Sequence, residues 1–508
     1  MTALIILLTM AAYLAWVVAI GFKFSKKNKD TDDFYLGGRK LGPFVTAMSA
    51  EASDMSSWLL LGLPGVAYLA GLPEACWTAI GLAVGTYFNW LIVAKRIRRY
   101  SIKLDAITVP EFFTKRYRDT KHILQFVAAL IVVVFFVPYT GSGFAACGKL
   151  FSSLFGMDYH VAMIVSALVI AVYTTLGGFL AASTTDFIQS IVMTIAIVVV
   201  FGFGVSVAGG WDAVMANAQA LPGYLSLVQG YDVTTGTAAT YSGLSIASTL
   251  AWGLGYFGMP HILLRFMAAR KEEELTLSRR IASVWVVISM AVAVLIGIVG
   301  LGMSKVGAIE TLSGTNSETV LVKIAQLLAS KGWFFAIVAG VILAGALAAT
   351  MSTADSQLLA AASGVTEDIL TAKFGLKLDA KKQMIVARAS VIAISLIGII
   401  VAWNPDSSVF KIVSFAWAGF GATFGPIVLL ALFWKRSNLQ GAIAGMISGG
   451  AVVFIWKFVV AKLGGVFAIY ELLPAFIVAI VVNVIVSLAT KAPSKEITDE
   501  FEAVKAEK

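Results

Sequence analysis

The stretch Ser49–Trp58, S-A-E-A-S-D-M-S-S-W, places two carboxylates and four serines inside a hydrophobic span that runs from about Leu41 to Ala70. An acid near the centre of a bilayer costs roughly 2.5–3.5 kcal/mol on insertion scales, and such residues usually mark the path of an ion or a solute. Serine side chains also compete for backbone hydrogen bonds, which weakens a helix. This stretch therefore predicts a membrane helix that is broken at its middle and holds a cation and a small solute.

The whole chain has the composition of an integral membrane protein. Only 13% of its residues are charged, whereas a soluble domain usually carries about 25%. The net charge of +9 would suit a nucleic-acid partner, but the basic residues lie in short loops between apolar spans. That distribution is typical of cytoplasmic loops. We therefore expect a lipid bilayer as the surroundings of the chain and no nucleic acid as a partner.

Apolar runs of sufficient length predict an all-α protein with about thirteen transmembrane helices. They form one transporter domain over residues 1–490, followed by a cytoplasmic tail at 491–508. The expected spans are 3–22, 41–70, 72–95, 122–152, 160–178, 186–208, 240–266, 281–303, 333–363, 384–403, 408–434, 440–462 and 468–490.

The distribution of basic residues predicts the orientation of the chain. If alternate loops and the tail after residue 490 lie on one side, that side holds 31 of the 38 Lys and Arg residues. A basic excess marks the cytoplasmic side, so we expect the N-terminus outside and the C-terminus inside. The loop at 211–240 contains no Lys or Arg, which suits an exterior loop.

The spans divide into two blocks of five, at about 41–208 and 240–434, with extra helices at 3–22, 440–462 and 468–490. Because five is odd, the second block enters the membrane from the opposite side, as in the inverted repeats of many transporters. Each block should begin with an interrupted helix. The second begins with Trp252–His261, W-G-L-G-Y-F-G-M-P-H, whose glycines and proline weaken a helix.

A third polar cluster lies in the ninth span, at Ala344–Leu359. Ala349, Ser352 and Thr353 are spaced i, i+3, i+4 and share one helix face. Small residues and hydroxyls also mediate membrane helix packing, so the cluster alone fits packing as well as an ion site. An interruption after Ala52–Met55 would free backbone carbonyls for the other side of an ion, and this favours a sodium site.

Aromatic residues coincide with both predicted breaks. Trp252, Tyr256 and Pro260 follow i, i+4, i+8, Trp58 lies four residues after Asp54, and Tyr139 follows Pro138. Aromatic stripes in membranes commonly form interfacial belts or core, but belts do not lie at mid-span. A pocket with aromatic walls suits a compact apolar ring, and amides at a half-helix N-terminus suit its carboxylate.

Two acids have open roles on this reasoning. Asp54 either binds the cation directly or holds the broken helix together through backbone amides. Asp186, in S-T-T-D-F at the start of the sixth span, either caps that helix or helps to release the ion inward.

Other functional classes find no support in the sequence. There is no G-x-x-x-x-G-K-[ST] loop for nucleotides, no catalytic triad, and no Cys or His spacing for a metal other than sodium. We expect no enzyme activity, no cofactor beyond Na⁺ as the coupling ion, and no obligate protein partner.

Several stretches resemble the solute:sodium symporter family, and the resemblance covers essentially the whole chain. They are F-Y-L-G-G-R at 34–39, S-D-M-S at 53–56, W-L-L-L-G-L-P-G at 58–65, L-G-G-F-L-A at 176–181, W-G-L-G-Y-F-G-M-P-H-I-L at 252–263, M-S-T at 351–353 and F-A-W-A-G-F-G-A at 415–422. The resemblance implies a leucine-transporter-like core of two inverted five-helix repeats. It also implies sodium-coupled import of L-proline by alternating access across the bacterial inner membrane.

The resemblance further implies roles for individual residues. A sodium site would combine the carbonyls of Ala52, Met55 and Ala349 with the side chains of Ser352 and Thr353, and Asp54 would be essential for coupling. Asp186 falls where the family carries a cytoplasmic acid linked to ion release. The implied proline-binding residues are Ser56, Trp58, Tyr139, Trp252, Tyr256 and Pro260.

Three positions depart from the family pattern. Glu51 and Ser57 stand where small residues such as glycine are usual, and Met259 stands where glutamine is usual. These departures concern substrate preference. The alternatives to proline symport are sodium symport of another small carboxylate or a sugar, and a membrane sensor that binds its solute without transporting it.

Overall fold

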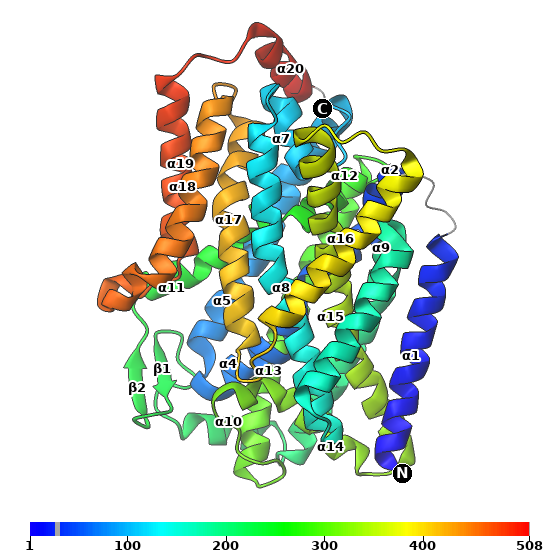
Figure 1. Cartoon of the computed structure of the whole chain (residues 1–508). Coiled ribbons are helices and arrows are strands. Elements are labelled where there is room, and N and C mark those ends of the chain that lie inside the picture. The colour runs from blue at the N-terminus through cyan, green and yellow to red at the C-terminus, as the bar shows by residue number, and fades with distance from the viewer. Residues whose placement is uncertain (26–30, 507–508) are drawn as a thin grey trace.

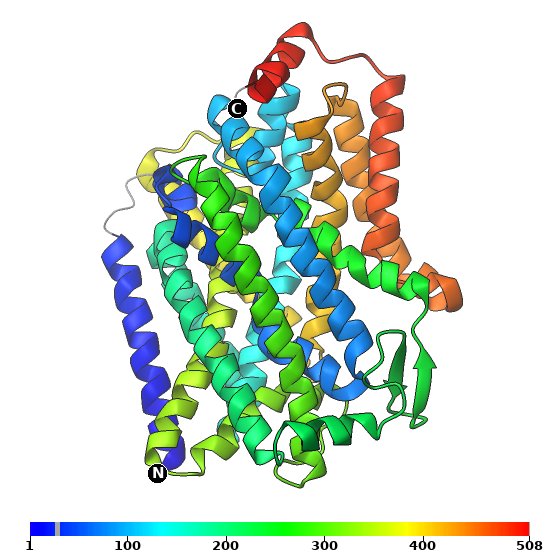
Figure 2. The same cartoon turned by 180° about the vertical axis from the view of Figure 1, so that it is seen from behind.

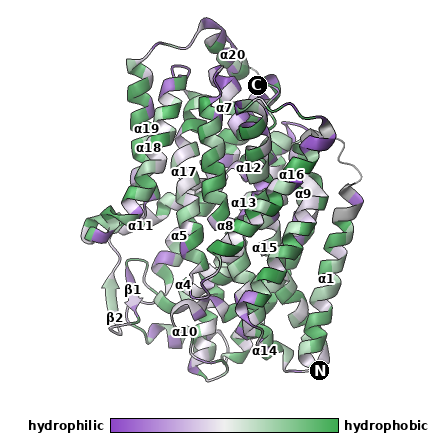
Figure 3. Ribbon diagram, viewed as in Figure 1, coloured by the Kyte–Doolittle hydropathy of each residue, from purple (hydrophilic) through white to green (hydrophobic). Residues whose placement is uncertain are grey.

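The computed structural model describes residues 1–25 and 31–506, which form a bundle of long helices (Figure 1). The basic loop predicted at 23–40 and the tail predicted at 491–508 lie partly outside the described residues. The N-terminus and the C-terminal helix lie at opposite ends of the bundle (Figures 1 and 2). Apolar residues dominate the long helices, and polar residues gather toward the two ends (Figure 3). This distribution suits a chain that spans a bilayer, where helices satisfy their own backbone groups.

The long helices account for most of the bundle. They are α1 (Thr2–Ser25), α5 (Leu72–Phe88), α8 (Ile123–Phe155), α9 (Tyr159–Val207), α13 (Glu274–Lys305), α15 (Trp333–Ser363), α16 (Ala380–Val401), α17 (Val409–Phe433), α18 (Leu439–Phe458) and α19 (Leu472–Ala489).

Shorter elements break or connect these helices. The α-helices are α2 (Thr31–Leu36), α3 (Pro43–Asp54), α4 (Leu63–Ala70), α6 (Ala94–Lys103), α7 (Val109–Tyr117), α10 (Trp211–Gln219), α11 (Gly243–Leu250), α12 (Pro260–Ala268), α14 (Val320–Ala329) and α20 (Lys495–Ala506). The 3₁₀ and π turns are η1 (Gly37–Arg39), η2 (Trp58–Gly62), η3 (Asn89–Val93), η4 (Ala251–Gly258), η5 (Gly314–Thr319), η6 (Gly364–Lys373), η7 (Val460–Leu463) and η8 (Gly465–Phe467). The strands β1 (Gln229–Asp232) and β2 (Thr237–Thr240) form an antiparallel hairpin.

Within the described part of the chain, ten helices have the length and apolar composition to cross a membrane. The multi-pass, all-α prediction is therefore confirmed, but the count of thirteen is not. The difference has a structural cause, because the two predicted spans at 41–70 and 240–266 are each divided into short helices and the spans at 160–178 and 186–208 join into α9.

The first broken helix lies where the Ser/Asp-rich stretch predicts it. Helix α3 ends at Asp54, and the Ser56 amide donates to the Asp54 carbonyl in a tight turn. The chain resumes at Trp58 as the π turn η2 and continues into α4. A helix that ends inside the bundle leaves its last carbonyls without the amides of a next turn, so they are free to bind other groups.

The second broken helix consists of α11, η4 and α12. Met259 has an extended backbone between η4 and α12, and Pro260 opens α12, where its fixed φ and missing N–H suit the first position. A Cβ at Gly258 would lie 2.3 Å from the backbone oxygen of Phe420 on α17. Only glycine permits this close approach of the break to α17.

Helix α9 changes direction at Gly178, where the backbone has φ +67° and ψ −173°. This conformation is essentially restricted to glycine. The chain therefore passes from the predicted fifth span to the sixth without a separating loop.

The two broken helices lie at the centre of the bundle. Helix α15 packs against α9, α1 and α8, and α3 packs against α9, α13, α12 and α15. On the other side, η4 packs against α17 and α5. The two breaks thus lie inside the bundle, each packed against long helices on its own side, and the three polar clusters of the sequence come together there.

We expect Gly178→Ala to destabilise the protein by about 1–3 kcal/mol, because an L side chain disfavours this backbone conformation. Gly202→Ala is a matched control in the same helix, since a Cβ there meets nothing within 4 Å and alanine favours a helix by roughly 0.5–1 kcal/mol. Thermal unfolding of both variants in detergent measures the difference. Equal melting temperatures would contradict the interpretation of the bend.

Candidate ion and substrate site

Oxygen atoms from the broken end of α3 and from the middle of α15 meet at the centre of the bundle. The Ser352 hydroxyl donates to the Ala52 carbonyl at 2.8 Å and lies 3.2 Å from the Ala349 carbonyl. The Thr353 hydroxyl lies 3.4 Å from the same Ala52 carbonyl. All four residues are buried. Unwound carbonyls combined with hydroxyls are the oxygen donors that sodium sites in transporters use.

The hydroxyls of this cluster can change partners. A Ser or Thr hydroxyl carries two acceptor lone pairs and a proton that rotates to suit its surroundings, so both can turn their lone pairs toward an ion. Four of the five implied sodium ligands therefore lie together. Met55 is buried at the end of α3, one residue beyond the helix, and its role as the fifth ligand stays a prediction.

The Asp54 side chain points to the second broken helix. Its Oδ2 accepts a short hydrogen bond from the Tyr256 hydroxyl in η4. Its backbone carbonyl accepts from the Trp58 indole at 3.0 Å and from the Tyr139 hydroxyl at 3.4 Å. Asp54 therefore contacts the second broken helix through its side chain, and the choice between the two roles that the sequence left open stays a prediction.

A closed cavity without room for a water molecule adjoins the ion cluster, and three of the predicted residues line it. Ser56 and Tyr139 come from the predicted substrate set, and Thr353 comes from the ion cluster. The lining is Ser56, Tyr139, Ser142, Gly143, Thr350, Thr353, Ala354 and Gln357. The cavity therefore joins the first break to α8 and α15.

Aromatic rings from the predicted set form a wall between this region and one end of the bundle. The rings of Trp58 and Trp252 lie 6.0 Å apart, and Trp252 stacks on Tyr470 at 5.2 Å. Trp417 donates from its indole to the Trp252 carbonyl at 2.7 Å and meets the Tyr256 ring edge-on. These contacts join five large rings at the second break, of which Trp58, Trp252 and Tyr256 belong to the predicted set.

Beyond the wall, a wide cavity of about 830 Å³ lies against α11 and η5, and Trp252 and Tyr470 form part of its lining. The β1–β2 hairpin and α10, which come from the loop predicted to be exterior, lie toward the same end of the bundle (Figure 1). Pro260 is buried at the first position of α12, and it is outside the lining of both cavities.

Sequence reasoning missed several residues of this region. Thr350, Ala354 and Gln357 share the face of α15 that carries Thr353, and their spacing of three and four residues could have identified them. Trp417 lies within the quoted stretch 415–422, but nothing in its spacing connected it to the breaks. Tyr470 reaches the wall from the segment before α19, and no local sequence signal indicates this.

Asp186 forms a buried ion pair with Arg265 from α12. Asp186 Oδ2 lies 3.1 Å from Arg265 Nη2 and accepts from the Ser49 hydroxyl at 2.7 Å. Arg265 also donates from Nε to the Ser49 oxygen at 3.0 Å and from Nη2 to Ser356 on α15. This pair connects α9, α3, α12 and α15 at one point.

The alternative of Asp186 as a helix cap is wrong. The helix does not begin there, because α9 is continuous from its bend at Gly178 through Asp186. Arg265, counted among the basic loop residues in the sequence, is 1% exposed. Its hydrophobic neighbours in α12 gave no sign that it pairs with an acid.

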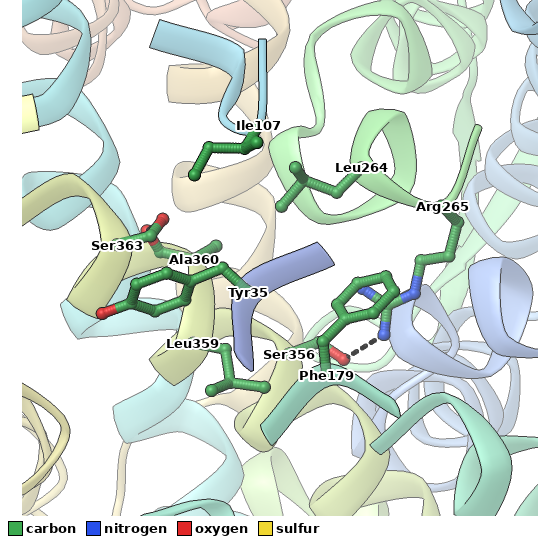
Figure 4. Close-up of a pocket in the computed structure, with 9 residues that line it drawn as sticks. All are labelled: Tyr35, Ile107, Phe179, Leu264, Arg265, Ser356, Leu359, Ala360 and Ser363. Carbon is green, nitrogen blue, oxygen red and sulfur yellow. Dashed lines mark hydrogen bonds between the residues drawn. The ribbon is translucent and has the colours of Figure 1, made fainter. Parts of the chain in front are cut away.

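A second narrow cavity has Arg265 of this ion pair in its lining (Figure 4). The Arg265 guanidinium reaches Ser356, and the Phe179 ring lies over it at 5.0 Å. Tyr35, Ile107 and Leu264 complete the cavity together with residues of α15. The ion pair and the ring of Phe179 therefore lie between the ion cluster and the end of the bundle that carries α2 and α7.

Comparison with known proteins identifies relatives over nearly the full length. The model of the sodium:solute symporter family matches residues 34–449. The osmoregulated proline transporter OpuE of Bacillus subtilis is 40% identical over 492 residues, with 96% of each chain covered. A sodium/proline symporter of Staphylococcus aureus is 39% identical over 503 residues, covering 98% of this chain and 95% of that protein.

Two solved structures are similar in fold. The substrate-bound, outward-open structure of a Na⁺-coupled sialic acid symporter has a TM-score of 0.77 at 19% identity and covers 97% of this chain and 99% of that one. Mhp1, a nucleobase-cation-symport-1 family transporter in a closed conformation with bromovinylhydantoin bound, has a TM-score of 0.56 at 12% identity and covers 93% and 98%. They confirm the leucine-transporter-like fold class.

We expect Arg265→Leu to destabilise the protein by about 3–5 kcal/mol, because it leaves Asp186 as a buried charge without its partner. Arg270→Leu is the matched control, since Arg270 forms an exposed pair with Glu274 in the next segment and such pairs contribute about 0–1 kcal/mol. Thermal unfolding in detergent compares them. A wild-type melting temperature for Arg265→Leu would show that the pair does not stabilise the bundle.

Proposed function

This chain belongs to the sodium:solute symporter family, and on that basis we propose that it imports L-proline together with sodium by alternating access. The family is one of membrane transporters, so the chain is a transporter and not an enzyme, with Na⁺ as its coupling ion. Relatives named as a proline transporter and as a sodium/proline symporter, each similar over at least 95% of both chains, support proline as the substrate.

The observation that carries this proposal is the contact between the Ser352 hydroxyl and the Ala52 carbonyl across the first break. A cation bound by Ala52, Ala349, Ser352 and Thr353 would join α3 to α15 at the place where α3 is interrupted. The same interruption supplies Ser56 to the adjoining cavity. Sodium bound at this cluster would therefore order the part of the adjoining cavity that Ser56 lines.

The lining of the neighbouring cavity suits a small solute with a charged head, although the cavity is closed in this structure and has no room for a water molecule. The Tyr139 ring supplies apolar surface, and Ser56 and Thr353 supply hydroxyls. The backbone amides that follow the break can meet a carboxylate, since a half-helix N-terminus carries partial positive charge. We assign proline binding to Ser56, Trp58, Tyr139, Trp252, Tyr256 and Pro260.

The coupling requires no covalent chemistry. If sodium tightens proline binding, proline tightens sodium binding by the same factor. An inside-negative potential contributes about 2.3 kcal/mol per 100 mV for each sodium ion that enters. This driving force supports accumulation of a zwitterion against its gradient.

The remaining assignments complete the model of transport. We infer that Met55 supplies a further sodium ligand, that Asp54 holds the two breaks in register, and that the Asp186–Arg265 pair controls release of sodium to the inside. We place the protein in the bacterial inner membrane with its N-terminus outside and its C-terminus in the cytoplasm. The basic loops support this orientation.

Thr353→Ala should raise the sodium concentration for half-maximal proline uptake about 10- to 100-fold, because a contact to a charged group contributes about 1.5–3 kcal/mol. Uptake of labelled proline into proteoliposomes at varied sodium measures this shift. Ser395→Ala is the control, since Ser395 is a buried hydroxyl that bonds only within α16. Equal wild-type uptake in potassium alone would contradict sodium coupling.

A panel of unlabelled solutes should show that proline competes with labelled proline more strongly than other small carboxylates or sugars. The aromatic wall favours a compact apolar ring over longer or more polar solutes. Counterflow with proline inside the vesicles should accelerate uptake of the label. Binding without exchange would identify the protein as a solute sensor, and preferential competition by another solute would identify that solute as the substrate.

A further inference from the structure

Helix α3 carries two buried acids on a face different from the one that meets α15. Glu51 and Asp54 are spaced i, i+3, and each is at most 1% exposed. Glu51 Oε1 accepts from the Trp90 indole at 2.8 Å in η3, and Asp54 Oδ2 accepts from the Tyr256 hydroxyl in η4. Ala52 lies between them in sequence and faces Ser352. The two acids thus face η3 and η4, away from the sodium cluster described above.

Neither acid has a basic partner among residues 1–25 and 31–506. The groups that act on the Glu51 carboxylate are the Trp90 indole and the Asp54 carboxylate, and the group that acts on Asp54 is Tyr256. Asp186, buried to the same degree, has Arg265. Two adjacent carboxylates at the centre of a membrane protein without a countercharge are costly, and a bound cation removes that cost.

Each carboxylate leaves one oxygen available. In the described structure, Glu51 Oε2 and Asp54 Oδ1 are buried and have no hydrogen-bond partner. Asp54 contacts the Tyr256 hydroxyl directly, and Glu51 lies one helical turn earlier on α3, at Trp90. One oxygen of each acid therefore remains available beside the contact of α3 with η3 and η4.

Two further side-chain oxygens come from α5 and η3, which face α3. Asn89 and Thr86 are fully buried, and Asn89 Oδ1 and Thr86 Oγ1 have no partner among the described residues. Asn89 donates from Nδ2 to the Tyr256 carbonyl at 3.0 Å, which fixes the amide and leaves its oxygen unused. The Thr86 hydroxyl lies beside the Tyr256 hydroxyl. Tyr256 is thus a neighbour of Asp54, Thr86 and Asn89, and Glu51 joins them through Trp90, the residue after Asn89.

Backbone features hold these elements close together. A Cβ at Gly85 would lie 2.3 Å from the Gly253 carbonyl, so α5 and η4 touch through their backbones immediately beside Thr86. Asn89 begins the π turn η3, and π turns inside helices are frequent at functional sites. The arrangement places donors from α3, α5 and η3 around one residue of η4.

We propose that Glu51, Asp54, Thr86 and Asn89 form a second sodium site, separate from the cluster at Ser352. This inference rests on the proposed sodium coupling and extends it to two sodium ions per transport cycle. Two carboxylate oxygens with an amide and a hydroxyl oxygen make a donor set of four. Calcium takes six to eight oxygens and magnesium demands an octahedron, so this set suits a monovalent ion better.

The proposed site also links the ion to the gate. Tyr256 belongs to the broken segment that carries Trp252 in the aromatic wall. A sodium ion among the four side chains would hold α3, α5 and η4 against one another and keep the second break in place. Both breaks would then be ordered by sodium, each through its own site.

Binding of ²²Na⁺ to the purified full-length protein in lipid nanodiscs, without proline, tests the proposal directly. The wild type should saturate at two ions per chain. Glu51→Gln should saturate at one ion, whereas Thr353→Ala should still reach two ions, one of them at a half-saturating concentration about 10- to 100-fold higher. The double variant should bind only the weakened ion. A wild type that saturates at one ion, or a Glu51→Gln protein that still binds two, overturns the second site.

Two further variants guard against misfolding as an explanation. Thr86→Val keeps the shape and both carboxylates, and it should raise the half-saturating concentration of one ion about tenfold. Glu310→Gln changes an exposed acid and should bind two ions as the wild type does. An unchanged isotherm for Thr86→Val would overturn the assignment of its hydroxyl.

Failure of this inference differs from failure of the proposed function. The ion count needs no proline, so it is independent of which solute the protein carries. Proline uptake should depend on sodium with a Hill coefficient near two in the wild type and near one in Glu51→Gln. Sodium-driven proline uptake with one bound ion would retain the proposed function and reject the second site.

Discussion

The hydrogen bond from the Ser352 hydroxyl to the Ala52 carbonyl joins two elements that the rest of the bundle keeps in place. A helix that stops in a bilayer leaves backbone carbonyls that hydrocarbon cannot satisfy. Here α3 stops beside α15, whose hydroxyls satisfy one of these carbonyls. The same requirement makes the site usable, because groups that need a partner inside a membrane will accept a cation.

The buried acids of the bundle meet this requirement in two ways. Asp186 has a permanent partner in Arg265, and the pair joins four helices. Glu51 and Asp54 have only neutral donors, from Trp90 and Tyr256. A carboxylate with a fixed countercharge stabilises one arrangement, whereas one without it makes the arrangement depend on what is bound. Asp186, with its fixed partner, therefore suits a structural junction, whereas Glu51 and Asp54 suit a junction that depends on a bound ion.

The sequence predicted the parts of this site that local patterns control. The Ser/Asp-rich stretch predicted the first break, glycines and Pro260 predicted the second, and the spacing of Ser352 and Thr353 predicted a shared face. The pairing of Arg265 with Asp186 was not predicted, because the two residues are 79 positions apart in the chain. The partnership of Trp90 with Glu51 is equally non-local, at 39 residues, and periodicity carries no information about such contacts.

Span boundaries failed for a different reason. Hydropathy marks where a chain leaves the membrane, but at Gly178 two helices meet at a kink without a polar loop between them. A positive φ at glycine is a backbone property with no signature in apolar periodicity. For the same reason, hydropathy does not predict the close approach of Gly85 to Gly253, because it scores each glycine separately.

One broken segment connects the outer, central and inner parts of the proposed pathway. Trp252 contributes to the aromatic wall, Tyr256 contacts Asp54, and Arg265 pairs with Asp186, all within η4 and α12. The extended backbone at Met259 separates the first two from the third, so it can absorb a change of direction between them. Alternating access requires that one end of a path opens as the other closes. A segment that contacts all three levels can transmit such a change through its own hinge, because moving α12 relative to η4 alters the ion pair at one end while the ring contacts at the other end persist.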